Sequence, residues 1–220
     1  MSAERDDAYR AIGRYVAEFS QLVRATRVAV AEYVAGDPTK MDIPEMMLGE
    51  QPAQAITNVF FGVCRMVGNL DTDESKVASV LRKGVNDIIE ERNNFSHGDW
   101  TVGAFGFGLP ATLPATFHVL DPTLVRIRTV RGTGPRETTT LSVQDLDART
   151  DGLQRVLQRV HEYGRLALGL PIRRKDGKSP AKGEYRVRDV LVVVGGDKKG
   201  GKARVEPTGP RAGELTWAYY

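Results

Sequence analysis

The residue types best suited to catalysis lie together in one short stretch of the chain, EERNNFSHGDW, at positions 90–100. Aliphatic residues precede this stretch at spacings of three and four, which is typical of one face of an amphipathic helix. Continuing that spacing places Arg92, Asn93 and His97 where further aliphatic residues would be expected. A cation on the buried side of a helix is costly unless a carboxylate or water meets it. Arg92 therefore either pairs with an acidic residue of another helix or lines a cleft.

Together, these three side chains could perform proton-transfer chemistry. Asn93 and His97 are four residues apart, so they share a helix face and the amide can orient the imidazole. Arg92 and His97 are separated by about 140° around the helix, so both can flank one substrate group. His97 falls in the last helical turn, where the dipole favours the imidazolium, and it can exchange a proton near neutrality. Glu90 and Glu91 are predicted to be solvated.

The pattern Arg-Asn-x-x-x-His near the end of a long helix, with Gly98 following, resembles the motif of the HEPN superfamily. Members are compact helical bundles, and most are metal-independent endoribonucleases of toxin–antitoxin, phage-defence and RNA-processing systems. Their protomers typically dimerise so that two motifs face one cleft. The resemblance implies a homodimer that acts on RNA or a nucleotide, with no cofactor and no metal. It also implies a cognate antitoxin or a defence partner protein.

The resemblance assigns a role to each residue of the motif. RNA cleavage of this kind uses the ribose 2′-hydroxyl as the nucleophile, so DNA would be refused. His97 would be the general acid or base, Arg92 would bind the scissile phosphate, and Asn93 would orient His97 or contact the phosphate. Ser96 and Trp100 are weaker substrate-binding candidates. Ser96 lies one turn after Arg92, and Trp100 could stack on a base, but packing is the favoured role for both.

Two other functions fit the same residues. Many HEPN-like proteins are inactive, so the chain could be a non-catalytic module that binds RNA, a nucleotide or a protein. It could also be a plain helical interaction protein in which Arg92 is paired and buried. Loss of the Arg92 side chain would then unfold the protein, because the partner carboxylate would be stranded.

Hydrophobic patterning predicts a mainly α-helical protein. Four long helices are expected: one at about residues 4–35, one at 52–70, one that starts after the acidic cluster at residues 71–74 and ends at residue 97, and one at 142–168. Asp71 or Asp73 is expected to cap the third helix, a capping box at Ser142 to open the fourth, and Asp99 with Trp100 to close the end of the third. Two or three antiparallel strands are expected within residues 115–120, 124–131 and 137–141. The predicted fold is an up-and-down four-helix bundle with a small antiparallel β insertion, at about residues 101–141, before the last helix.

The helical spacing also predicts which residues fill the core. Cys64 and Met66 are expected to be buried between helices. The predicted buried face of the first helix consists of Ile12, Val16, Phe19, Val23, Val30 and Val34, and that of the second of Ile56, Val59, Phe60, Val63 and Val67. The Met- and Pro-containing segment at residues 41–52 is predicted to be a loop.

Composition changes after the fourth helix, so residues 1–170 are predicted to form the helical domain. Residues 171–220 are predicted to be a basic linker followed by a small β appendage or a disordered tail. They carry twelve Lys and Arg against six Asp and Glu, a balance of +6, so the net charge of +3 leaves the domain at −3. A basic tail fits a polyanionic partner. Strands are expected within it at residues 185–194, 203–206 and 215–220.

Several other kinds of site are excluded or weak. The single cysteine excludes an internal disulfide and a Cys/His zinc site. The segment 196–202 nearly spells a phosphate-binding loop, but Ala203 stands where Ser or Thr is required, so a basic hairpin turn is predicted. The glycine-rich stretch at 103–108 is predicted to be a loop, and His118 and His161 are predicted to be structural.

The chain contains no run of about 18 apolar residues. Its N-terminal residues, MSAERDDAYR, are charged and lack the apolar core of a signal peptide. These features predict a soluble cytoplasmic protein with no membrane partner.

Overall fold

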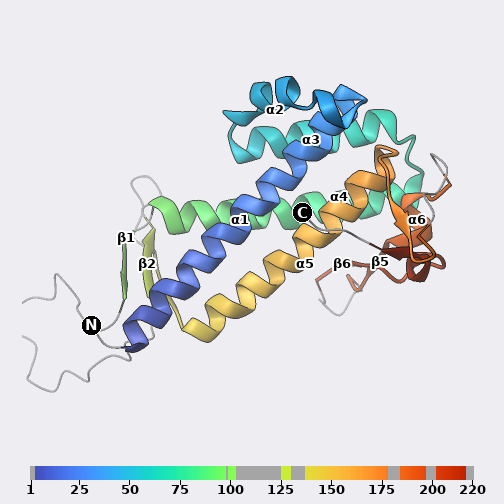
Figure 1. The fold of residues 1–220 in the computed structure, drawn as a ribbon. Helices are drawn as coiled ribbons and strands as arrows, with labels where there is room; N and C mark the ends of the chain where they lie inside the picture. The colour runs from blue at the N-terminus through green and yellow to red at the C-terminus, as the bar shows by residue number, and fades with distance from the viewer. Residues whose placement is uncertain are drawn as a thin grey trace, which may run out of the picture. The chain divides into compact units, whose positions relative to one another are not determined.

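The computed structural model describes residues 3–97, 99–102, 125–129, 137–177, 184–196 and 202–216, and it is mainly helical, as predicted (Figure 1). Its longer helices are α1 (Ala3–Ala35), α3 (Ala53–Val67), α4 (Thr72–His97) and α5 (Val143–Ala167). The shorter ones are α2 (Asp42–Gly49) and α6 (Val187–Val190), and two 3-10 turns occupy Pro38–Lys40 and Ala212–Glu214. Each long helix begins and ends within a few residues of its predicted bounds.

Side chains at the starts of α4 and α5 explain where those helices begin. The Asp71 carboxylate accepts hydrogen bonds from the backbone amides of Asp73 and Glu74, both at 3.0 Å. At α5, Ser142 Oγ accepts from the Asp145 amide at 3.0 Å, and the Asp145 carboxylate accepts from the Ser142 amide at 2.8 Å. Such bonds satisfy amides that have no partner within the helix. The predicted capping box is confirmed, and Asp71 rather than Asp73 caps α4.

A three-stranded antiparallel sheet stands between α4 and α5 in the chain. β1 (Asp99–Val102) pairs with β2 (Val125–Thr129), and β2 pairs with β3 (Glu137–Leu141). The second and third predicted strands are therefore confirmed. The expectation that residues 99–100 close the preceding helix is wrong, because both pair with β2. The first predicted strand and the predicted glycine-rich loop lie outside the described residues.

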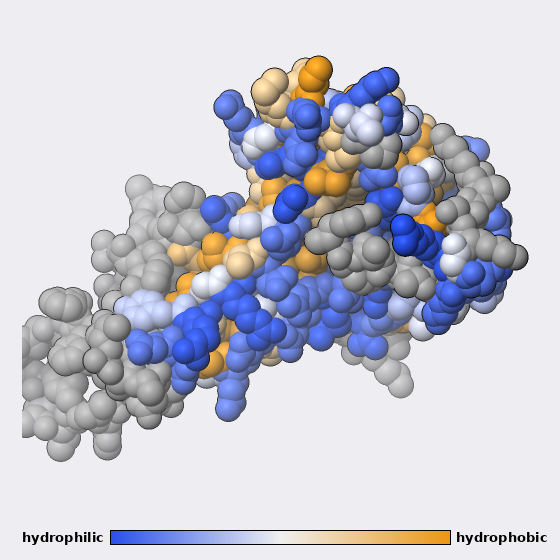
Figure 2. Space-filling model, viewed as in Figure 1, coloured by the Kyte–Doolittle hydropathy of each residue, from blue (hydrophilic) through white to orange (hydrophobic). Residues whose placement is uncertain are grey.

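Helix α2 occupies the segment that was expected to be a loop, so that prediction is wrong. Asp42 and Glu45 lie in its first turn, where the positive end of the helix dipole favours acidic side chains. None of its residues is buried, and Ile43, Met46 and Met47 are exposed. Figure 2 shows hydrophobic side chains gathered at the top of the view, where Figure 1 places α2. The helix therefore leaves apolar surface in contact with solvent.

The buried faces of α1 and α3 match the predicted ones only in part. Cys64 is fully buried, as predicted, but Met66 is 86% exposed and is not a core residue. Both faces include buried aromatic residues: Phe60 and Phe19 were predicted to be buried, whereas Phe61 and Tyr15 were not. They remove more apolar area from water than valine does. Four valines predicted to be buried are exposed: Val16, Val34, Val59 and Val67.

The chain divides into two compact units. The first unit consists of residues 1–19 and 90–153, and the second of residues 20–89 and 154–220. The first unit contains the candidate motif. In the second, the Phe60 ring lies 6.1 Å from that of Tyr163, measured between centroids. Gly164 permits this close approach, because a Cβ there would lie 2.8 Å from the Phe60 ring. The domain boundary placed at residue 170 stays a prediction.

The C-terminal segment belongs to the second unit and contains two small antiparallel sheets. β4 (Arg173–Arg174) pairs with β7 (Leu215–Thr216), and β5 (Val192–Val194) pairs with β6 (Arg204–Glu206). Strands near residues 203–206 and 215–220 are therefore present in the described part of this segment. Its buried residues are Tyr185, Val187, Val190, Leu191, Val205 and Leu215.

Helix α6 interrupts the strand predicted at residues 185–194, and that prediction is correct only for β5. The Asp189 carboxylate accepts a hydrogen bond from the Arg186 amide at 2.8 Å and stabilises the first turn of α6. The Arg186 side chain binds the Glu74 carboxylate of α4 through Nε at 3.0 Å and Nη2 at 2.5 Å. Glu74 is only 1% exposed. The C-terminal segment therefore supplies the cation that this buried acid requires.

Candidate anion-binding site on helix α4

Four of the candidate residues lie on one unbroken helix, because α4 continues to His97. Helical spacing relates Arg92 to Ser96 and Asn93 to His97 as neighbours one turn apart. Trp100 follows in β1. The structure describes the side chains of Arg92 and Asn93. It does not describe those of Ser96, His97 and Trp100.

Arg92 is anchored by an aromatic ring rather than by an acid. Its Cζ atom lies 5.4 Å from the ring centroid of Phe19 in α1, a cation–π distance. Its Nε is buried and makes no hydrogen bond to any residue that the structure describes. Its Nη1 donates to Asn93 Oδ1 at 3.5 Å, which is long for such a bond. Among the side chains that the structure describes, no carboxylate forms an ion pair with Arg92. The guanidinium therefore lies over an aromatic ring, and its Nη groups have no carboxylate partner among the described side chains.

The acidic residue next to Arg92 is bound elsewhere. Glu91 forms an ion pair with Arg149 of α5 and accepts a hydrogen bond from the Tyr15 hydroxyl of α1 at 2.9 Å. The prediction that Glu91 is solvated is wrong, whereas Glu90 is exposed as predicted. Successive residues of a helix point about 100° apart, so adjacent side chains do not face each other. Glu91 and Arg92 therefore meet different partners.

Tyr15, like Arg149, is a residue of this site that the sequence did not reveal. Its ring centroid lies 5.1 Å from that of Phe95, so the ring packs against α4 while its hydroxyl reaches Glu91. Burial raises the pKa of the Tyr15 phenol to about 12, and the charge of Arg149 opposes this shift. Tyr15 therefore stays protonated near neutrality and acts as a donor. Its spacing of four from Phe19 was the available signal, since it places both rings on one face of α1.

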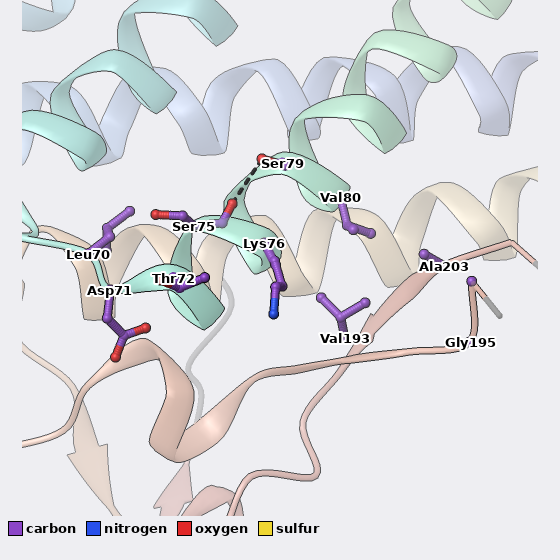
Figure 3. A pocket seen from close by; sticks show the side chains of 11 residues that line it. Leu70, Asp71, Thr72, Ser75, Lys76, Ser79, Val80, Val193, Gly195 and Ala203 are labelled. Atoms are coloured by element: carbon purple, nitrogen blue, oxygen red, sulfur yellow. Dashed lines mark hydrogen bonds between the residues drawn. The ribbon is translucent and has the colours of Figure 1, made fainter.

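A groove of about 630 Å³ lies in the second unit, between the first turns of α4 and the β5–β6 hairpin (Figure 3). Ser79 Oγ donates to the Ser75 carbonyl at 2.9 Å, and Lys76 Nζ lies 2.8 Å from an Asp73 oxygen. The Asp71 carboxylate on its wall caps α4 and pairs with Arg188. These polar groups serve the local structure, so the groove is a weaker candidate than Arg92.

The segment that resembles a phosphate-binding loop connects β5 to β6, so a strand and not a helix follows it. Gly195 and Gly196 have φ angles of +75° and +79°, which glycine adopts without strain. The antiparallel pairing of β5 with β6 agrees with the hairpin predicted here. Residues 197–201, between the two strands, lie outside the described residues.

The remaining titratable candidates show no catalytic arrangement. Burial and the nearby Arg165 lower the pKa of His161 to about 4, so its imidazole is neutral at pH 7. Burial raises the pKa of the Cys64 thiol. His118 lies outside the described residues. In the part of the chain that is described, no group of three His, Cys, Asp or Glu side chains could hold a metal ion, and no helix is long and apolar enough to span a bilayer.

No protein-family model, curated protein or solved structure matches this chain. The chemistry of the site therefore has to be argued from its own side chains. Arg92 presents guanidinium donors, and the exposed Asn93 presents an amide beside them. Both groups can donate to the oxygens of one anion, and the guanidinium geometry suits phosphate.

Proposed function

We propose that this protein is a metal-independent endoribonuclease of the HEPN type, with a role in toxin activity, antiphage defence or RNA processing. The observation that carries the proposal is the state of Arg92, which rests on Phe19 and has no carboxylate partner among the described side chains. A charge left unpaired on a packed helix is costly, and a phosphate ligand would compensate it.

The proposal includes an architecture. Helices α1, α3, α4 and α5 would form an up-and-down four-helix bundle, with β1–β3 as an insertion and residues 171–220 as a basic segment. The order of these elements along the chain supports this arrangement. Two copies would form a cytoplasmic homodimer in which two motifs face one cleft.

In the proposed reaction the ribose 2′-oxygen attacks the adjacent phosphorus. A P–O2′ bond forms and the P–O5′ bond breaks, which leaves a cyclic phosphate and a 5′-hydroxyl. His97 accepts the 2′-hydroxyl proton as a base or donates a proton to the departing 5′-oxygen as an acid. Arg92 stabilises the charge that develops on the phosphate, and Asn93 orients His97 or contacts the phosphate. Ser96 and Trp100 would contribute to substrate binding.

RNA cleavage in the presence of EDTA tests this proposal. The full-length protein should cleave single-stranded RNA and leave DNA of the same sequence intact. His97→Ala and Arg92→Ala should each lower the rate by about 10²- to 10⁴-fold. Arg82→Ala removes an exposed arginine from the same helix and should leave the rate unchanged. Undiminished cleavage by His97→Ala would overturn the assignment.

A non-catalytic module that binds RNA is the second candidate, and the C-terminal segment favours it. Besides Arg188, which pairs with Asp71, four basic residues in the described part of this segment are exposed: Arg173, Lys175, Lys202 and Arg204. This function predicts salt-sensitive RNA binding without cleavage. Replacing these four residues by Gln is a better test than deleting the segment, because deletion would strand Glu74 without Arg186.

A further inference from the structure

The arginines of the first unit differ in whether they form an ion pair with a carboxylate. Arg14 of α1 lies 3.3 Å from the carboxylates of both Asp147 and Asp151 in α5. Arg149, which lies between those two aspartates in the sequence, pairs with Glu91. Arg92 is the exception among the arginines of this unit whose side chains are described in detail.

The partners of Glu91 explain why Arg92 is the exception. Glu91 precedes Arg92 in the chain, so its charge is always near the guanidinium. Arg149 neutralises that charge and, with the Tyr15 hydroxyl, holds the carboxylate on the side of α4 that meets α1 and α5. Without Arg149, the charge of the Glu91 carboxylate would be uncompensated and would lower the positive potential at Arg92.

We propose that Arg149 is a positioning residue that occupies the Glu91 carboxylate and so keeps the Arg92 guanidinium available to a phosphate group. Its importance for RNA cleavage rests on the proposed function. The effect on anion binding is a separate property of the same site, and inorganic phosphate can measure it without any RNA.

The test is a titration of the full-length protein with inorganic phosphate, followed through the NMR signal of the Arg92 Nε–H group. Phosphate should shift this signal in the wild-type protein. Arg149→Gln should weaken the binding about three- to tenfold, which is the effect of one uncompensated charge near the site. Arg149→Lys keeps the positive charge and should retain most of the affinity.

A second substitution separates this role from a merely structural one. Adding Glu91→Gln to Arg149→Gln removes the stranded charge, so the double variant should recover the wild-type affinity. If Arg149 served only stability, the double variant would bind no better than the single one. Lys83→Gln removes a cation that pairs with Asp87 on the same helix and should leave the affinity unchanged.

Three results would overturn the inference: no phosphate effect on Arg92 in the wild-type protein, unchanged affinity in Arg149→Gln, or no recovery in the double variant. The RNA assay gives an independent answer. If phosphate behaves as expected but the wild-type protein cleaves no RNA in EDTA, the endoribonuclease proposal fails and the inference about Arg149 stands.

Discussion

Tyr15→Phe should lower the free energy of unfolding by about 1 to 2 kcal/mol. The substitution removes the hydrogen bond that the Tyr15 hydroxyl donates to Glu91 at 2.9 Å. Bonds to charged acceptors contribute about 1.5 to 3 kcal/mol. The Glu91 side chain keeps Arg149 and is 24% exposed, so water offsets part of the loss. For a chain of this size, the expected decrease in Tm is roughly 2 to 8 °C.

Tyr163→Phe is the matched control for this prediction. Tyr163 is 0% exposed and Tyr15 is 1% exposed, so both substitutions act on a buried ring. The Tyr163 hydroxyl, however, is buried and has no hydrogen-bond partner in the described part of the chain. Removing such a group is neutral or stabilising. Urea unfolding followed by circular dichroism measures both variants, and equal losses in the two would refute the reasoning, because they would not depend on the bond to Glu91.

Three further predictions concern the second unit. Gly164→Ala should lower the free energy of unfolding, measured by chemical denaturation, by about 1 to 3 kcal/mol, because its Cβ would lie 2.8 Å from the Phe60 ring. Gly62→Ala is the control: the space around Gly62 is open, so this substitution should stabilise α3 by about 0.5 to 1 kcal/mol. The folded-state pKa of His161, about 4, lies below its ordinary 6.5, so stability should fall as the pH decreases from about 6.5 to about 4, and a His161→Gln variant should lack this slope in acid titrations of Tm. Cys64 is buried and its thiol pKa is raised, so a thiol reagent should label it only on unfolding, and rapid labelling of the native protein would contradict this.

The sequence predicted α4 better than any other helix because its buried face is built from aliphatic residues. Val77, Leu81, Val85 and Ile88 recur at helical spacing, and all are buried. Its start was also predictable, since Asp71 caps it through local hydrogen bonds that depend on neighbouring residues alone.

The face of α1 was not predictable in the same way. Phe19 and Val30 of the predicted stripe are buried, but Val16 and Val34 are exposed. Ala8, Ala11 and Tyr15, which the spacing did not single out, are also buried. Alanine and tyrosine occur both inside and outside proteins, so spacing alone gives them little weight. The choice between the two faces depends on packing against other helices, which a single sequence does not show.

The sequence predicted which residues of α4 form the candidate site, but not which residues of other helices contact them. The sequence offered Arg92 two alternatives, an acidic partner or an open cleft. It could not show that Glu91 is taken up by Tyr15 and Arg149, because residues far apart in the chain make these contacts. The hydroxyl and the guanidinium that bind Glu91 were ordinary residues in the sequence and gained a role only through the fold.

The ion pair between Glu74 and Arg186 also has a consequence for how the protein is made. The two residues are 112 positions apart, so Arg186 is synthesised on the order of 10 s after Glu74 at ordinary translation rates. Burial of the Glu74 carboxylate before then would leave it without its cation. We therefore expect the first turn of α4 to stay unpacked on the ribosome while the rest of the helices are produced, and to settle only when the C-terminal segment arrives.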